Sequence, residues 1–295
     1  MAWLRRKRAG IGGKISRIAR MLRWSARIAL IALCADAFYL MLIWPDWKAL
    51  ASGPVPKSSF IQEYELRRAR DRSLPSLRWQ PVALSRMPPP LVRAVILAED
   101  ARFYEHDGFD LIAFKEAMSY NLAEGRMALG ASTISQQTVK NLFLSQARTP
   151  WRKWHELVLT WGMEHRLSKR RILELYLNVA EFGSGIYGVQ AAARAYFQTP
   201  VDEISLEQAA GLAATLPSPR HNNPATRTSY FERRVERILE LLIRFPGDAA
   251  QSIVREPARR LPVELAIRLQ TPPERSVRRP AGAVIIAPLW LVMPL

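Results

Sequence analysis

The sequence is poor in cysteine and lacks internal repeats and low-complexity tracts. Cys34 is the only cysteine among 295 residues. It lies inside an apolar run, so the chain has neither a disulfide framework nor a cysteine metal site. With 49% hydrophobic and 23% charged residues, the chain is not disordered and can bury one substantial core with appendages.

Acidic residues are absent from the first 27 positions, which hold nine Lys and Arg residues. The formal net charge is +17, so about half of the excess lies there. Segment 28–44 is apolar except for Asp36 and is just long enough to cross a bilayer as a helix. Asp36 costs about 2.5–3.5 kcal/mol on insertion scales, which the surrounding apolar residues can offset. We expect a single-pass inner-membrane anchor with a cytoplasmic N-terminus.

Two alternatives to this interpretation rest on the same segment. Ala35-Asp36-Ala37 resembles a signal-peptide cleavage site, but cleavage there would leave residues 38–44 as an exposed apolar terminus. The positive charge could also indicate nucleic-acid binding. The densest basic cluster abuts the membrane segment, however, where anionic lipid headgroups account for it. We therefore expect an uncleaved anchor and no nucleic-acid partner.

The rest of the chain divides by composition. We expect a basic cytoplasmic segment at 1–27, the transmembrane anchor at 28–44, a periplasmic stalk at 45–90 with one short helix near 62–72, a helical domain at 91–245, and a C-terminal extension of unknown role at 246–295. Periodicity and capping signals predict a mainly α domain. Its helices are expected at 91–100, 110–124, 133–145, 150–167, 169–178, 189–196, 206–216 and 230–244.

The first of these helices is wholly apolar and ends in two acids, Glu99 and Asp100, which aromatic residues and His106 follow. Desolvation at such a position raises the pKa of a carboxyl, as a general acid or base requires. The alternative is that both acids are solvated residues at a helix end. This pattern alone does not choose between the two.

A polar face marks the helix expected at 133–145. Thr133, Gln137, Lys140 and Asn141 are spaced i, i+4, i+7 and i+8, which puts them on one side. Hydroxyl, amide and ammonium groups together favour a groove that binds sugar hydroxyls and phosphate. The alternative is a solvent face with a capping box begun by Thr133.

Three charged residues lie near the start of the helix that Pro150 introduces. Arg152 and Glu156 are spaced i and i+4, which is the spacing of an ordinary intrahelical ion pair. Alternatively, Arg152 and Lys153 form a phosphate or pyrophosphate clamp, with Glu156 as a second carboxylate facing Glu99. Spacing alone leaves both possibilities open.

Taken in order, these stretches resemble a known family. The motifs are Glu-Asp-x-x-Phe-x-x-His-x-Gly at 99–108, Ser-Thr-Ile-x-Gln-Gln-x-x-Lys-Asn at 132–141, Arg-Lys-x-x-Glu at 152–156, Ile-Leu-Glu-x-Tyr-Leu-Asn at 172–178, and Leu-Pro-Ser-Pro at 216–219. They resemble the biosynthetic peptidoglycan glycosyltransferases, family 51 of the glycosyltransferases. Ala131 departs from the pattern, where a second glycine is common. The tail after Pro246 is too short for a transpeptidase domain, so the chain is expected to be monofunctional.

The resemblance implies a lysozyme-like, mostly helical fold with a membrane-dipping lobe. It implies polymerisation of lipid II onto a growing lipid-linked glycan, with inversion to a β-1,4 bond and release of polyprenyl diphosphate. Glu99 would be the general base, and Glu156 would orient the cations or help hold a magnesium or manganese ion; no organic cofactor is implied. The residues expected to shape the groove or bind substrate are Asp100, Phe103, His106, Thr133, Gln137, Lys140, Asn141, Arg152 and Lys153.

Two other functions compete with this one. A lytic enzyme can also use two carboxylates on a lysozyme-like scaffold, but it has no pyrophosphate to stabilise, which would leave Lys140, Arg152 and Lys153 without a task. A non-catalytic membrane scaffold would bind other cell-wall synthesis or division proteins. The presence of both Glu99 and Glu156 argues against it.

Overall fold

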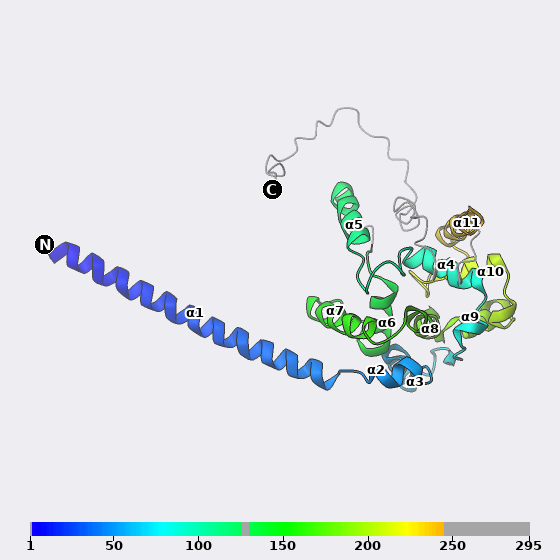
Figure 1. The fold of residues 1–295 in the computed structure, drawn as a ribbon, viewed down its shortest axis with the longest axis horizontal. Coiled ribbons are helices and arrows are strands. Elements are labelled where there is room, and N and C mark those ends of the chain that lie inside the picture. The colour runs from blue at the N-terminus through cyan, green and yellow to red at the C-terminus, as the bar shows by residue number, and fades with distance from the viewer. Residues whose placement is uncertain (1, 126–129, 245–295) are drawn as a thin grey trace, which may run out of the picture.

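The computed structural model describes residues 2–125 and 130–244, so the expected extension at 246–295 lies outside the described residues. The N-terminal helix α1 (Ala2–Leu42) extends away from the rest of the protein (Figure 1). Its part Arg20–Leu42 is 23 residues long and contains an 18-residue window with a mean hydropathy of 1.7, which is long and apolar enough to cross a membrane. The helix ends before Trp44, the last residue of the expected span, because Pro45 disfavours helical backbone in the residue that precedes it.

Residues 45–90 differ from the expected stalk, because they pack against the helical domain. They form α2 (Trp47–Ser52), α3 (Ser59–Arg70), β1 (Arg78–Trp79) and the short 3-10 helix η1 (Leu84–Arg86). Apolar residues spaced along this segment enter the main core: Trp47, Leu50, Val82 and Met87. Only Trp47 and Leu50 have helical spacing, and the six residues of α2 are too few to show a period; Val82 and Met87 are isolated among Pro-, Ser- and Arg-rich sequence.

All eight helices expected in the domain are present, and each end lies within three residues of its expected position. They are α4 (Pro89–Glu99), α5 (Leu111–Glu124), α6 (Ile134–Phe143), α7 (Pro150–Glu164), α8 (Lys169–Val179), α9 (Val189–Phe197), α10 (Leu206–Thr215) and α11 (Ser229–Arg244), with a 3-10 helix η2 (Val201–Glu203). The mainly α fold is confirmed.

A small sheet joins the former stalk to the domain. Its strands β1, β3 (Ile186–Tyr187) and β2 (Glu181–Gly183) are hydrogen-bonded in the order β1-β3-β2, parallel between β1 and β3 and antiparallel between β3 and β2. Gly185 in the β2–β3 turn has φ +74°, and a Cβ there would meet the Tyr64 hydroxyl at 2.6 Å. Glycine therefore permits both the turn and the close approach of α3.

The arrangement of the helices brings the end of α4 next to α6. α4 is buried along most of its length by apolar residues, and it packs against α10 and α11. α6 packs against α3, α7 and α8. In contrast, α5 stands out from the body (Figure 1), and it buries only Ala117 and Asn121. The residues with sequence signals for chemistry lie on α4, α6 and α7.

Candidate active site

Glu99 is the last residue of α4, and its side chain lies in a pocket of about 260 Å³. Its Oε1 accepts a hydrogen bond from Arg234 Nη2 at 3.0 Å, and its Oε2 accepts one from Gln137 Nε2 at 3.1 Å. The side chain keeps 11% of its surface exposed. The pocket is lined by Ala98, Glu99, Gly130, Ser132, Gln137, Pro217, Tyr230 and Arg234.

The electrostatic environment suits Glu99 for proton transfer. Burial raises the pKa of its carboxyl, and this effect outweighs Arg234, Gln137 and Lys140, which act in the opposite direction. A raised pKa makes the carboxylate a stronger base, while the remaining exposure leaves it open to a ligand in the pocket. Of the two possibilities that the sequence left open for Glu99, the structure has the desolvated carboxyl.

Gln137 is held in one orientation by Tyr176 of α8. The Tyr176 hydroxyl donates to Gln137 Oε1 at 3.1 Å, which turns the amide nitrogen of Gln137 toward Glu99. Burial raises the pKa of Tyr176 well above its ordinary value, so the hydroxyl stays protonated and remains a donor. The two hydrogen bonds, from Tyr176 to Gln137 and from Gln137 to Glu99, therefore orient the Glu99 carboxylate through uncharged donors.

Lys140 follows Gln137 by about one turn of α6 and interacts electrostatically with both candidate carboxylates. Burial lowers the pKa of its ammonium group, whereas Glu156 and Glu99 favour the charged form. Within residues 2–125 and 130–244, no hydrogen bond or ion pair engages the Lys140 side chain. A partly desolvated cation without a partner is suited to bind an anionic ligand.

On α7, Glu156 binds both neighbouring cations. One carboxylate oxygen accepts from Arg152 Nη1 and the other from Lys153 Nζ. Lys153 Nζ also donates to Ser132 Oγ at 3.2 Å, and Ser132 lines the pocket of Glu99. Glu156 is only 2% exposed. The pair spaced i and i+4 thus exists, but it is part of a cluster of three charged groups that adjoins the pocket.

Asp100 and His106 support the site rather than line it. Asp100 accepts from His106 Nε2 at 3.0 Å and from the backbone N–H of Ile134 at 2.9 Å, so it holds the first residue of α6. His106 Nδ1 accepts from the backbone N–H of Gly108 at 3.1 Å. These bonds shape the groove by fixing α6 to the end of α4.

Three further expected substrate-binding residues occupy structural positions. Thr133 forms the expected capping box with Gln136 and donates to the carbonyl of Gly108 at 2.7 Å. Asn141 is 6% exposed, and its carbonyl accepts from Ser59 of α3. Phe103 has 0% exposure and belongs to the core. Of the two roles expected for Phe103, its burial is compatible with shaping the groove and not with direct contact to substrate.

The residues present do not fit a metal ion held by the protein. At Glu156 both oxygens already bind cations, and a divalent ion would have to displace them. Asp100, His106 and Asp110 place ligand atoms within 4.8 Å of one another. Asp110, however, caps α5 and pairs with Arg102, while Asp100 and His106 are engaged as described. The geometry favours the other expected role of Glu156, which is to orient the cations.

Sequence reasoning missed Arg234 and Tyr176. Arg234 is 1% exposed and donates to both Glu99 and the carbonyl of Ala98. A signal for it exists: Arg234 falls on the apolar stripe of α11 with Phe231 and Ile238, where an arginine needs a buried partner. Tyr176 is part of the motif at 172–178, but a tyrosine on a core-packing helix gave no indication of a contact with the site.

Comparison with known proteins agrees with this geometry. The Transglycosylase family model matches residues 70–242, which is more than half of the chain. The chain is 41% identical over 221 residues to the biosynthetic peptidoglycan transglycosylase of Nitrosospira multiformis, covering 74% of this chain and 94% of that protein. It is 42% identical over 229 residues to the protein of that name from Laribacter hongkongensis, covering 73% and 97%. The match to the Bordetella pertussis protein is 42% over 226 residues, covering 73% and 92%. The chain therefore belongs to the transglycosylase family, whose domain is the lysozyme-like fold described above.

Proposed function

We propose that this protein polymerises the glycan strands of peptidoglycan from lipid II on the outer face of a bacterial inner membrane. The observation that carries the proposal is that Lys140, on the same helix as Gln137, interacts electrostatically with both Glu99 and Glu156 but forms no ion pair or hydrogen bond with a described residue. A base and an anion-binding cation side by side are what transfer from a diphosphate donor requires.

In the proposed reaction Glu99 acts as the general base. It takes the proton from the 4-hydroxyl of the lipid II acceptor as that oxygen attacks the anomeric carbon of the lipid-linked glycan donor. The bond between the anomeric carbon and the diphosphate oxygen breaks, and its electron pair leaves with the polyprenyl diphosphate. Attack from the opposite face converts the α-linked donor into a β-1,4 bond. The raised pKa of Glu99 supports this role.

The cations stabilise the departing diphosphate. Lys140 supplies a charge that no ion pair or hydrogen bond with a described residue engages, and Arg152 and Lys153 supply two more. Glu156 holds the latter two in place before substrate arrives, so little reorganisation is needed as negative charge develops. In the proposed mechanism Glu156 positions these cations.

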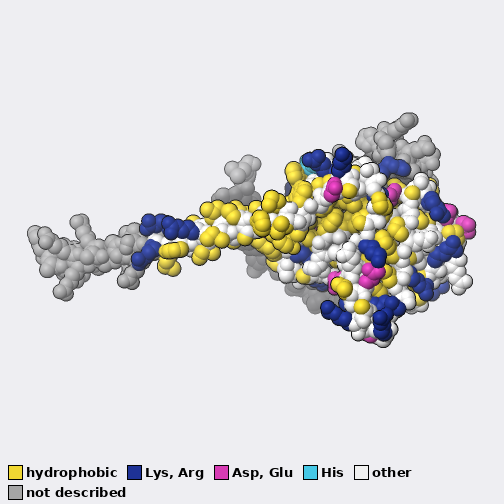
Figure 2. All heavy atoms as spheres, turned by 90° about the horizontal axis from the view of Figure 1, so that it is seen from below, with side chains coloured by type: hydrophobic (Ala, Val, Ile, Leu, Met, Phe, Trp, Pro, Cys, Tyr) yellow, Lys and Arg dark blue, Asp and Glu magenta, His cyan; other side chains and the backbone are white. Residues whose placement is uncertain are grey.

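Membrane association follows from two apolar surfaces. Hydrophobic side chains cover the part of α1 next to the domain and continue onto the adjoining face of the domain (Figure 2). In α5, Leu111, Phe114 and Leu122 are 60%, 40% and 76% exposed, and we propose that this helix is the lobe that dips into the bilayer. The basic N-terminal segment would remain cytoplasmic, and the catalytic domain would lie in the periplasm. Other cell-wall synthesis or division proteins are proposed partners.

A polymerisation assay tests the function. The purified full-length protein is incubated with lipid II in detergent or vesicles, and we expect β-1,4-linked glycan strands and release of polyprenyl diphosphate. Isolated cell-wall sacculi serve as the comparison substrate. Soluble fragments from sacculi without polymer from lipid II would establish a lytic enzyme instead, and inactivity on both would favour a scaffold.

A further inference from the structure

Asp36 is the one acidic residue in the apolar part of α1, and it is 5% exposed. Its neighbours on the same helix are exposed, since Leu33 is 62% and Phe38 is 58% exposed. Only 6% of the membrane segment is buried inside the protein. The anchor therefore touches the domain at few positions, and a carboxylate occupies one of them.

Two side chains of α7 bind this carboxylate. His155 Nε2 lies 2.6 Å from Asp36 Oδ1, and Trp154 Nε1 donates to Asp36 Oδ2 at 2.9 Å. The ring of Tyr39, one turn further along α1, lies 5.0 Å from the ring of His155. A second contact fixes the end of the anchor, because a Cβ on Gly162 would meet the ring of Trp44 at 2.9 Å. Both ends of α7 are thus docked to the anchor segment.

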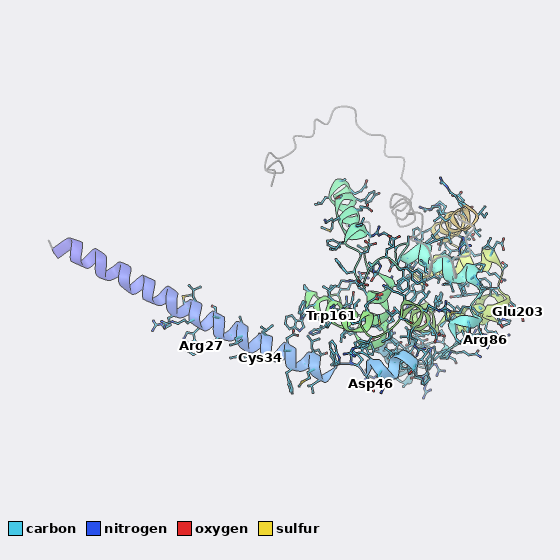
Figure 3. The ribbon with its side chains drawn as sticks, in the orientation of Figure 1. Arg27, Cys34, Asp46, Arg86, Trp161 and Glu203 are labelled. Carbon is cyan, nitrogen blue, oxygen red and sulfur yellow. The ribbon has the colours of Figure 1, made fainter. Side chains whose placement is uncertain are left out.

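The same helix carries the cationic cluster on another side. Glu156 follows Trp154 by two residues, which places it nearly opposite on a helix of 3.6 residues per turn. The exposed face of α7 carries Trp151, Trp154 and Trp161, which are 56%, 46% and 59% exposed. Trp161 lies on the side of the domain from which α1 extends (Figure 3). Tryptophans of this kind favour the boundary between headgroups and hydrocarbon.

Packing on the first turn of α7 is incomplete. A cavity of about 530 Å³ lies there, and its walls include Tyr39 of the anchor, Phe143 at the end of α6, and both Arg152 and His155 of α7. Because this cavity leaves the turn without dense contacts on that side, the hydrogen bonds to Asp36 hold the side of α7 that its packing on α6 does not reach. Asp36 lies six residues before the end of α1, which is about 9 Å along the helix axis.

We propose that Asp36 is a positioning residue: through His155 and Trp154 the anchor sets the depth of α7, and with it the cluster of Arg152, Lys153 and Glu156, relative to the membrane surface. The anchor is then part of the active-site architecture and not only a tether. The inference rests on the proposed function for its meaning, since the diphosphate of a lipid-linked substrate lies at a fixed depth in the same bilayer.

The first test compares two substrates in the full-length protein. Asp36→Ala makes the anchor more apolar, so insertion is retained. With lipid II embedded in vesicles, Asp36→Ala should lower the rate of polymerisation by about fivefold to a hundredfold, because a small misplacement of a charged clamp is costly. With a short-chain, water-soluble lipid II analogue the rate should stay within about twofold, as for a substitution outside the site. Equal losses on both substrates, or no loss on either, would overturn the proposal.

Conservative and control variants sharpen this comparison. Asp36→Asn should retain activity in vesicles, since its amide can accept from Trp154 and donate to an unprotonated His155 Nε2. Leu33→Ala, at an exposed position of the same helix, should behave as the wild type. A loss in Asp36→Asn as large as in Asp36→Ala would contradict a positioning role carried by hydrogen bonds.

A depth measurement is independent of activity. A nitroxide is attached at the exposed Arg148→Cys, next to the start of α7, in a Cys34→Ser background, and its accessibility to oxygen and to a nickel complex reports its depth. Asp36→Ala should shift or broaden that depth, and Asp36→Asn should restore it. An unchanged depth in Asp36→Ala would overturn the inference. If the wild type polymerises neither substrate, the proposed function fails, whereas the depth measurement still decides the role of Asp36.

Discussion

Glu99 Oε1 and Arg234 Nη2 lie 3.0 Å apart, although 135 positions of the sequence separate the two residues. The guanidinium of Arg234 opposes the rise that burial causes in the pKa of Glu99. The pair therefore tunes how strongly the carboxylate binds a proton. Arg234 also binds the carbonyl of Ala98, so it holds the backbone that presents Glu99.

Removing this cation should shift the pH dependence of the reaction. A base must be unprotonated, so activity falls as the pH drops through the pKa of Glu99. Arg234→Met removes the opposing charge, and the acid limb of kcat/KM should move to higher pH. Arg234→Lys, which keeps a cation, should shift the limb less. Coincident acid limbs for wild type and Arg234→Met would show that Arg234 does not act on Glu99.

Glu99→Gln should nearly abolish polymerisation while stabilising the fold. Glutamine keeps the size of the side chain but cannot take the proton, so the rate should fall by about 10²–10⁴-fold. A carboxyl with a raised pKa binds more protons folded than unfolded, so its contribution to stability declines as pH rises above the unfolded value. The variant should therefore have a higher Tm than the wild type at neutral pH. An active Glu99→Gln protein would refute the base assignment.

Lys140→Met should separate activity from stability. The substitution removes a cation that interacts with Glu99 and Glu156 and has no ion pair among the described residues, and loss of one such group costs about 10²–10³-fold in kcat. Because the desolvated ammonium disappears as well, Tm should stay equal or rise. Lys115→Met, at an exposed position on α5, is the matched control and should polymerise normally. Near-normal turnover in a folded Lys140→Met protein would remove Lys140 from the mechanism.

Tyr176→Phe tests the orientation of Gln137. The variant keeps the buried ring but loses the hydrogen bond to Gln137 Oε1, a contribution of about 0.5–1.5 kcal/mol. We expect a loss of turnover of about threefold to tenfold, since the amide can then rotate away from Glu99. Gln137→Ala combined with Tyr176→Phe should be no worse than Gln137→Ala alone. Additive losses would indicate that Tyr176 acts by another route.

Local sequence rules predicted the helices well, because their signals are themselves local. The start of α6 is predicted by the capping box of Thr133 with Gln136, and the start of α7 by Pro150. Both helices begin at or next to these residues. β1 and β3 have two residues each, which is too short for an alternating pattern. The contacts of segment 45–90 are made by single apolar residues with partners far away in the sequence. A local stretch of sequence does not predict such long-range contacts.

The site was predictable to the extent that one helix face defines it. Periodicity placed Gln137 and Lys140 together on α6, and both reach the region of Glu99. Thr133 and Asn141 share that face only approximately. Thr133 caps α6 and Asn141 is buried. The partnership of Glu99 with Arg234 required knowledge of how α4 packs on α11, which is a tertiary property.

The exposed apolar side chains of α5 affect how the protein can be purified and kept in solution. Removing α1 is the obvious way to obtain a truncated, detergent-free domain for crystallisation. Such a truncation would leave Leu111, Phe114 and Leu122 facing water, and it would also strip the partners from Trp154 and His155. A shortened protein is therefore expected to self-associate at high concentration unless polar substitutions are introduced on α5. Full-length protein in nanodiscs is the better sample for structural work.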